Sequence, residues 1–408
     1  MMRIFGYEIR KKSGSISIDT LIARLDAAFR TESGVAVTPD NAMESPTVRA
    51  IVTSISSSIA SVPLKIFRRE TFEKRIRKVE QPNHPLTALF KAPNAFQDSA
   101  TFWLDAVSWL LRYGNFYALK GQGRTGPIRE LTPILPDDMR VELNEASNLI
   151  YSSVSNGRVY DSGDVVHARL AARNGYKGDS PIMDVRNAIG FEIAAERMGA
   201  SVFANGAMPS LLFNYQEGFS EAFSSEEEEQ KFIRDFQEKY SKVGRFQSMM
   251  VPYGIKADTI TVDFEKSQFI GSRQYQRTVI AGAFGFPPHM AGDMSASSFN
   301  NVEQQSLNFI IHVVRPIMKI LESSLERSLL TADERAGGYI IRFDLDILTR
   351  VDFKARQEGL KIKREMGVIN ANDWREEDDQ NPISEGDGGE TYWTQGPSGQ
   401  NMQQGNGQ

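Results

Sequence analysis

The stretch that decides the fold is Ile280–Gln305, IAGAFGFPPHMAGDMSASSFNNVEQQ. Its middle part, 285–298, holds Pro287-Pro288, two glycines and several small polar residues, a composition typical of a loop. A helix is expected before this loop, at about 267–284, and another after it, at 300–330. The stretch therefore predicts two long helices joined by a loop.

The helix after the loop begins with a capping pattern and contains a proline. Asn300 with Glu303 three residues later resembles a capping box. The helix would be about 46 Å long at 1.5 Å per residue. Because Pro316 has no N–H and clashes with the carbonyl four residues back, the sequence predicts a kink near His312.

Another long helix is marked at both ends. Ser180-Pro181 begins it and Asn205-Gly206 ends it, which gives a length of about 37 Å. A compact insert is predicted next, with a strand at 209–215, a helix at 224–242 and a strand at 249–252. The insert helix is headed by four acidic residues, which the helix dipole favours and which are otherwise typical of a plain surface: Glu226, Glu227, Glu228 and Glu229.

Helices and strands alternate in the N-terminal half, after a loosely patterned arm of about forty residues. Ser45-Pro46 begins a helix that Pro63 ends. The alternating segment 64–79 predicts a hairpin with its turn at Glu70-Thr71. A helix at about 98–113, ended by Gly114, precedes five strand-like segments at 115–120, 128–131, 139–143, 149–154 and 164–170. We expect an antiparallel sheet with helices on it over 64–170.

The C-terminal part predicts a strand at 339–345 and short helices at 352–366 and 370–379. The tail from Asn381 is rich in Gly, Gln, Asn and Ser, and disorder is expected there.

Composition excludes several classes of site. The chain has no Cys, which removes disulfides, thiolate metal ligands and cysteine nucleophiles. Its net charge of −5 gives no overall attraction to nucleic acid or anionic lipid. The N-terminus lacks a signal-peptide pattern, and the most apolar stretch, 102–111, is too short to cross a bilayer and is interrupted by Asp105.

Catalytic motifs are not found, so we expect no enzyme and no cofactor. Gly121, Gly123 and Gly126 match a dinucleotide pattern, but Pro127 and an extended segment follow where a helix should begin, so a hairpin turn is favoured. No phosphate-binding loop with Gly-Lys-Ser or Gly-Lys-Thr occurs. The four histidines have no metal-ligand spacing, and structural roles are expected for His167 and His312.

Two charged clusters leave alternatives open. Asp344, Asp346 and Asp352 would hold a divalent cation or form a solvated or subunit-facing strand edge. One basic cluster would contact DNA phosphates or form a solvated hairpin, because glutamates are interleaved with it: Lys65, Arg68, Arg69, Lys74, Arg75, Arg77 and Lys78.

Five separate motifs in this order resemble the portal (head-to-tail connector) proteins of double-stranded DNA bacteriophages, in the short-chain branch common in long-tailed phages. The resemblance covers roughly residues 40–382. The motifs are Pro93-Asn94 with Tyr113-Gly114-Asn115-Phe116-Tyr117; Phe203-Ala-Asn205-Gly206-Ala-Met-Pro209; the opening stretch 280–305; Arg315-Pro316 with 321–330; and Met366-Gly-Val-Ile-Asn370-Ala-Asn372-Asp-Trp374-Arg375, where Asp373 replaces a commoner Glu.

The resemblance implies an α+β portal fold with named segments. An N-terminal arm (1–39) would precede an antiparallel β-rich wing (40–179), a first stem helix (180–206), a small α/β clip (207–256) and a second stem helix (257–284). A tunnel loop (285–299), a kinked long helix (300–337), a helical crown (338–380) and a disordered tail (381–408) would complete the chain.

The resemblance also implies a function and partners. The chain would form a closed homo-oligomeric ring, usually a dodecamer, at one capsid vertex in the virion, assembled in the host cytoplasm. Double-stranded DNA would pass through its channel. The large terminase subunit, the major capsid protein and a head-tail adaptor protein would dock on it, with Glu226–Glu229 at the clip docking site, and no membrane would be involved.

The loop is the sharpest site hypothesis within this resemblance. Its uncharged, flexible side chains would press on a DNA duplex without gripping phosphate, and the alternative is an ordinary helix connector. The candidate residues are Pro287, Pro288, His289, Met290, Met294, Ser295, Ser297, Ser298 and Phe299.

Two rival functions stay open. A phage-derived gene-transfer particle would use an equivalent ring, and gene neighbourhood separates it from a virus. A metal-dependent nuclease, a rival from the enzyme class, would need the carboxylates Asp344, Asp346 and Asp352.

Overall fold

The computed structural model describes residues 3–4, 7–8, 29–73, 75–122, 128–204, 210–215, 225–240, 255–260, 269–292, 305–344, 353–378, 380–395 and 401–403. The chain forms two compact units, one of residues 1–18, 38–184 and 281–408 and the other of residues 19–37 and 185–280. Helices and antiparallel sheets are mixed, so the predicted α+β class is confirmed.

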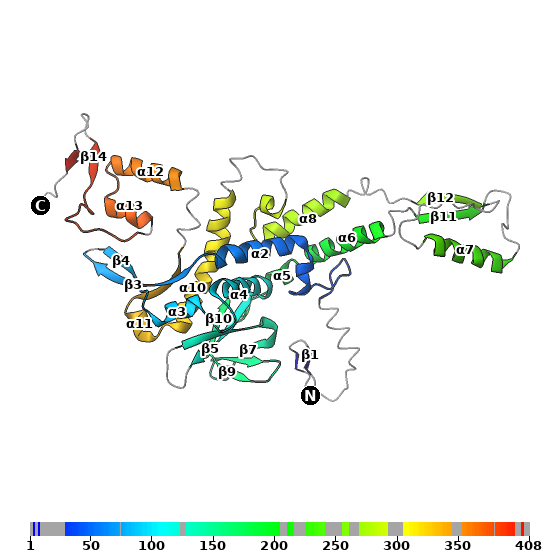
Figure 1. The fold of residues 1–408 in the computed structure, drawn as a ribbon, viewed down its shortest axis with the longest axis horizontal. Helices are drawn as coiled ribbons and strands as arrows, with labels where there is room; N and C mark the ends of the chain where they lie inside the picture. Colours follow the sequence, from blue (N-terminus) through cyan, green and yellow to red (C-terminus); the bar gives the residue numbers. More distant parts are fainter. Residues whose placement is uncertain are drawn as a thin grey trace. The chain divides into compact units, whose positions relative to one another are not determined.

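Two helices form the centre of the first unit and pack on each other (Figure 1). In α2 (Pro46–Ala60) the side chain of Ser45 accepts the N–H of Val48 at 3.1 Å. In α4 (Ser99–Tyr113) Asp98 accepts the N–H of Thr101 at 2.8 Å, and Gly114, with φ of 75°, ends the helix. The predicted limits of both helices are confirmed. Their buried faces hold the largest core side chains, among them Ile51, Ile55, Ile59, Phe102, Trp103 and Leu110.

The first unit holds three separate three-stranded antiparallel sheets among its described residues, where the sequence predicted one sheet over 64–170. The prediction missed that the first sheet is completed from the far end of the chain, because β13 pairs with β3. The sheets are β13 (Tyr339–Phe343), β3 (Leu64–Phe72) and β4 (Arg75–Glu80); β10 (Val165–Arg169), β5 (Asn115–Gln122) and β6 (Ile128–Ile134); and β7 (Met139–Leu143), β8 (Leu149–Ser153) and β9 (Val159–Asp161).

The β3–β4 hairpin turns three residues later than predicted. Glu70 pairs with Arg77 and Thr71 with Ile76, so neither lies in the turn. Glu73 is in the turn with φ of 53°, a left-handed conformation that is uncommon for a residue with a side chain. The sequence signal was missed because no glycine or asparagine marks this position.

The helix after the predicted loop changes its winding in front of Pro316. Residues 305–309 are α-helical, η4 (Ile310–Val314) is π-helical, and α10 (Arg315–Leu329) is α-helical again. The N–H of Arg315 bonds the carbonyl of Ile310, five residues back. A proline has no N–H to donate, and its ring clashes with the carbonyl four residues back. The wider π-helical turn gives that ring room. A kink at this point stays a prediction.

Helix α10 holds β13 through two acidic side chains, one buried and one half-buried, as well as through apolar ones. Glu322 accepts the N–H of Phe343 at 2.9 Å, and Glu326 accepts the N–H of Ile341 at 3.0 Å. Glu322 is 5% exposed, and its burial raises the pKa of its carboxyl group. Shorter elements complete this part of the chain: η1 (Asn41–Glu44), α3 (Pro85–Lys91), η2 (Pro136–Asp138), η3 (Pro288–Ala291) and α11 (Ala332–Ala336).

The C-terminal part contains α12 (Phe353–Glu365), α13 (Ala371–Glu377) and the pair β14 (Trp393–Gln395) and β15 (Asn401–Gln403). The sequence predicted disorder from residue 381. Instead, residues 380–392 form turns that bond α13 and the β3–β4 hairpin. Low apolar content misled the prediction because polar groups hold this segment. At the other end of the chain, β1 (Arg3–Ile4) pairs with β2 (Tyr7–Glu8).

The second unit contains α6 (Arg186–Ala204), the antiparallel pair β11 (Ser210–Tyr215) and β12 (Ile255–Ile260), α7 (Glu226–Tyr240) and most of α8 (Phe269–Ala283). The long helix predicted from residue 181 is divided at Val185, because α5 (Pro181–Asp184) belongs to the first unit. Ile182 in α5 and Ile189 in α6 are both fully buried. The predicted strand at 249–252 lies outside the described residues.

Candidate functional site

The described part of the predicted tunnel loop is anchored at its base. Phe286 is 2% exposed, and its ring meets that of Phe309 edge to face at 5.4 Å. Nδ1 of His289 lies 2.6 Å from Oε1 of Gln305. Pro287 and Pro288 begin η3, and Met290 is 38% exposed. These contacts bring residues 286–289 next to residues 305–309, the first described residues of the helix that follows the loop.

The other candidate loop residues, Met294, Ser295, Ser297, Ser298 and Phe299, lie outside the described residues, as does the capping pair Asn300 and Glu303. Gly285, at the start of the loop, has φ of 63°, and a Cβ atom there would lie 3.1 Å from a methyl carbon of Val313. Glycine is therefore required where the chain leaves α8 and passes η4.

Glu226, Glu227, Glu228 and Glu229, the residues predicted for clip docking, lie in the first turn of α7. Ser225 precedes them, and its hydroxyl accepts the N–H of Glu228 at 3.4 Å. Glu226, Glu227 and Glu228 are exposed and Glu229 is half-buried. They form an acidic surface at a helix start, which fits either docking or a plain surface.

The basic cluster and the carboxylate cluster of the sequence analysis are joined by one ion pair. Asp344 lies 2.9 Å from the ammonium group of Lys65, which also lies 3.3 Å from Glu80. These contacts raise the pKa of Lys65. Asp346 and Asp352 lie outside the described residues, and the part of the chain that the structure describes contains no group of three metal-ligating side chains.

His167 has the structural role that was predicted for it. Its Nε2 lies 3.1 Å from Oδ1 of Asn115, and its Nδ1 lies 3.2 Å from the hydroxyl of Tyr151. Burial lowers the pKa of His167 to about 3, so the ring is neutral. Tyr117 lies against it, with ring centroids 4.5 Å apart. His312 lies exposed in η4.

Three successive positions of the motif at 113–117, residues 114–116, have a physical reason. Gly114 takes a positive φ and touches the backbone of Asp179. Asn115 is buried, accepts the N–H of Gly178 at 2.7 Å and donates to the carbonyl of Gly178 at 2.8 Å. Phe116 packs edge to face on Phe102 at 5.7 Å. This motif therefore joins α4 and β5 to the segment 178–179.

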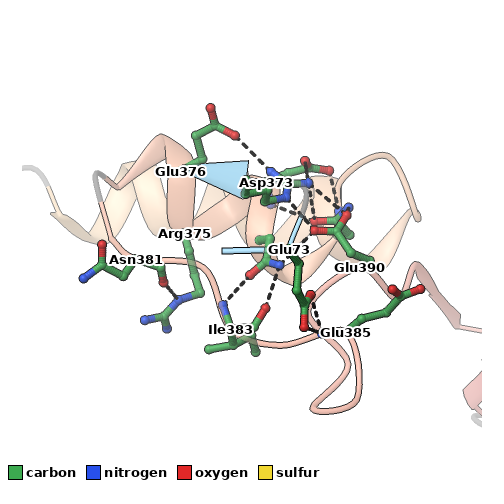
Figure 2. A network of polar contacts seen from close by, with 11 residues as sticks. Glu73, Asp373, Arg375, Glu376, Asn381, Ile383, Glu385 and Glu390 are labelled. Atoms are coloured by element: carbon green, nitrogen blue, oxygen red, sulfur yellow. Dashed lines mark hydrogen bonds and ion pairs between the residues drawn. The ribbon is translucent and has the colours of Figure 1, made fainter. Parts of the chain in front are cut away.

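The closing motif at 366–375 organises a polar cluster that sequence reasoning did not find (Figure 2). Asn370 and Asp373 form a reciprocal capping box at the start of α13. Asn372 is 2% exposed and bonds both backbone groups of Ile383, at 2.8 and 3.0 Å. Trp374 donates to Gln357 of α12 at 2.8 Å, and Arg375 donates to the carbonyl of Asn381 at 2.5 Å.

Arg75, from the tip of the β3–β4 hairpin, reaches the same cluster and meets Glu390, Asp373 and Glu376. Three of the seven basic residues of the hairpin form ion pairs with carboxylates, namely Lys65, Arg68 and Arg75, which favours a solvated hairpin over contact with DNA phosphates. Lys74 lies outside the described residues. The cluster was missed because Glu390 falls in a segment without apolar periodicity.

Comparison with known proteins gives one consistent result. Residues 46–379 match a family profile described as "Phage portal protein". The chain is 27% identical over 357 residues to the "Portal protein" of Enterobacteria phage HK97, covering 86% of this chain and 82% of that protein. It is 26% identical over 372 residues to the "Probable portal protein" of Streptomyces phage phiC31, covering 87% and 78%.

A solved structure shares the fold. It is described as the neck of a native gene transfer agent particle computed with C12 symmetry. It matches with a TM-score of 0.57 and 18% identity, and the match covers 89% of this chain and 99% of that one. Within the described ranges, every helix is too short or too polar to span a lipid bilayer.

Proposed function

Because the chain belongs to the phage portal protein family, we propose that it is the ring subunit at one capsid vertex, where double-stranded DNA is packaged into the head and later ejected. The family match over residues 46–379 is the observation that carries this proposal. The family is a structural component of the phage particle, and the chain is not an enzyme.

A ring of twelve subunits is the assembly that we propose. A closed ring needs two different surfaces on each subunit that fit each other around a rotation axis. The twelvefold symmetry of the similar gene transfer agent neck supports this number. Twelve copies of a chain with net charge −5 sum to −60, and such a ring offers little of the phosphate attraction that would hold DNA in place.

The segments of the subunit follow from the family fold. We propose that the sheets and helices within residues 40–179 form the wing and that α6 and α8 form the stem. The clip would be made by β11, α7 and β12, and α12 with α13 would form the crown. Since β13 pairs with β3, this strand fits the wing better than the crown to which the sequence prediction assigned it.

Residues 285–299 would form the tunnel loop that faces DNA. Its anchored base supports this role, since Phe286 and His289 contact Phe309 and Gln305. The exposed Met290 beside this base is an uncharged side chain that adapts its shape to a passing duplex.

The clip would be the docking platform for the large terminase subunit during packaging and for the head-tail adaptor protein afterwards. The exposed glutamates at the start of α7 would meet basic surfaces of these partners. The major capsid protein would surround the ring, and the particle would be assembled in the host cytoplasm.

Native mass spectrometry of the purified chain, with negative-stain images of the same sample, tests the ring. We expect closed rings of about twelve subunits with a central hole, since the stated neck symmetry is twelvefold. A monomer or dimer at micromolar concentration, both alone and with the capsid protein, would contradict the proposal.

A gene-transfer particle is the second candidate, since one similar solved structure is the neck of such a particle. Sequencing the DNA inside particles that contain this chain separates the two functions. Phage DNA in every particle indicates a virus, and random host fragments indicate a gene-transfer particle.

A further inference from the structure

Arg75 is the centre of an ion-pair cluster at the tip of the β3–β4 hairpin. Its Nε donates to Glu390 Oε1 at 2.5 Å and its Nη2 to Glu390 Oε2 at 3.1 Å, a bidentate pair. Nη2 also donates to Asp373 Oδ1 at 2.8 Å, and Nη1 donates to Glu376 Oε2 at 2.9 Å. One guanidinium group therefore holds three carboxylates.

These carboxylates belong to the C-terminal module, which we define as residues 353–392. Figure 1 shows its helices α12 and α13 beside the hairpin. Inside the module, Asn370 and Asn372 donate to Glu390 at 3.1 and 2.9 Å, so the carboxylate is already positioned for Arg75.

The hairpin tip makes two more contacts with the module. The N–H of Lys78 donates to Oδ1 of Asn381 at 2.5 Å. The carboxylate of Glu73 accepts the N–H of Glu385 at 3.0 Å (Figure 2). The left-handed backbone of Glu73 thus lies at a contact between hairpin and module. The amides of Lys78 and Glu385 donate across this contact, so their hydrogen exchange reports directly on docking.

Apolar burial contributes little to this attachment. Among the module's described residues, Leu360 is the apolar side chain that is buried, whereas the buried polar ones are Asn370 and Asn372. Phe72, Pro382 and Ile383 line a small pocket at the contact and are only half-buried. The module is therefore held to the hairpin mainly by charge and hydrogen bonds.

We propose that Arg75 and Glu390 form an electrostatic latch that switches the C-terminal module between a docked and a released position on the β3–β4 hairpin. Removing the guanidinium group takes away the attraction and leaves Glu390, Asp373 and Glu376 facing one another without a cation. The side chains of Arg75, Asp373 and Glu390 are 21%, 30% and 26% exposed, so salt reaches the latch. Since the Debye length falls from about 10 Å at 0.1 M salt to about 3 Å at 1 M, high salt releases the module.

Hydrogen exchange of the full-length chain, followed by mass spectrometry, tests the latch. In Arg75→Ala we expect the amides of Lys78 and Glu385 to exchange about tenfold faster, since a charge-assisted bidentate pair is lost. The amides of Asn372 and Trp374, which bond within the module, keep their protection. Glu390→Gln should act in the same direction and more weakly, because the glutamine keeps an acceptor.

Arg77→Ala is the matched control. Arg77 lies two residues along the same strand, with its guanidinium group 5.6 Å from the ring centre of Phe72, and its loss should leave both reporter amides protected. Equal effects of Arg75→Ala and Arg77→Ala would overturn the proposal, as would unchanged exchange in Arg75→Ala and Glu390→Gln. If Arg75→Ala loosens α2 and α4 as well, the wild-type salt titration decides: reporter amides that stay protected from 0.1 to 1 M salt refute the latch.

Discussion

Gly114 and Gly178 lie so close that a Cβ atom on Gly178 would be 2.1 Å from the carbonyl oxygen of Gly114. Asn115 bonds both backbone groups of Gly178 at the same place. The end of α4, the start of β5 and the segment before α5 therefore depend on two residues without side chains. Neither glycine has a substitute that fits, because the neighbouring atoms belong to backbone.

Gly178→Ala should lower the free energy of unfolding by about 3 kcal/mol, since overpacking against backbone forces the two segments apart. Urea unfolding measures this change. Gly163→Ala is the matched control, because a Cβ atom there meets nothing within 4 Å and its φ is not positive. A cost for Gly178→Ala no greater than for the control would contradict the close approach.

His167 should make the protein less stable as the pH falls below 6.5. Burial lowers the pKa of His167 to about 3, so between that value and 6.5 the unfolded chain binds a proton that the folded chain does not. The free energy of unfolding therefore keeps its full value above pH 6.5 and falls by about 2 kcal/mol by pH 5, as far as His167 determines it. His167→Gln, compared with wild type in unfolding experiments across this range, should remove that part of the slope; equal slopes would disprove the assignment.

Glu390 should keep the latch closed in mild acid. Arg75 lowers the pKa of Glu390 to about 2, so its contribution is present above the unfolded value of 4.5 and is lost as the pH falls through 2. We expect the stability difference between wild type and Glu390→Gln to persist at pH 4 to 5 and to vanish near pH 2. Thermal unfolding at these pH values measures it, and loss of the difference already at pH 5 would show that the carboxylate is not held in this way.

Deleting residues 293–297 should leave rings intact and impair DNA packaging or retention. The deletion leaves the anchored base of the loop intact, where the ring of Phe286 packs on that of Phe309 and His289 hydrogen-bonds Gln305. Ring images report assembly, and protected DNA per particle reports packaging. Normal packaging by intact rings would assign residues 285–299 to the alternative role of an ordinary connector.

Local chemistry was enough to predict most helices and strands. Ser45, Asp98 and Gly114 mark helix ends because capping and left-handed turns involve only a few neighbouring residues. The portal resemblance likewise rested on short motifs, and the family match over residues 46–379 confirms it. The site residues of the loop and clip stay predictions, and part of the loop lies outside the described residues.

The amino-acid sequence by itself determined the α+β class, the family and the limits of helices such as α2 and α4. Tertiary structure alone decided that β13 completes the sheet of β3, that α5 and α6 separate at Val185, and that Arg75 meets Glu390. The physical reason is the distance along the sequence between the residues that interact. Caps, turns and periodic faces depend on residues a few positions apart, whereas Arg75 and Glu390 are separated by 315 positions and meet only after the chain has folded.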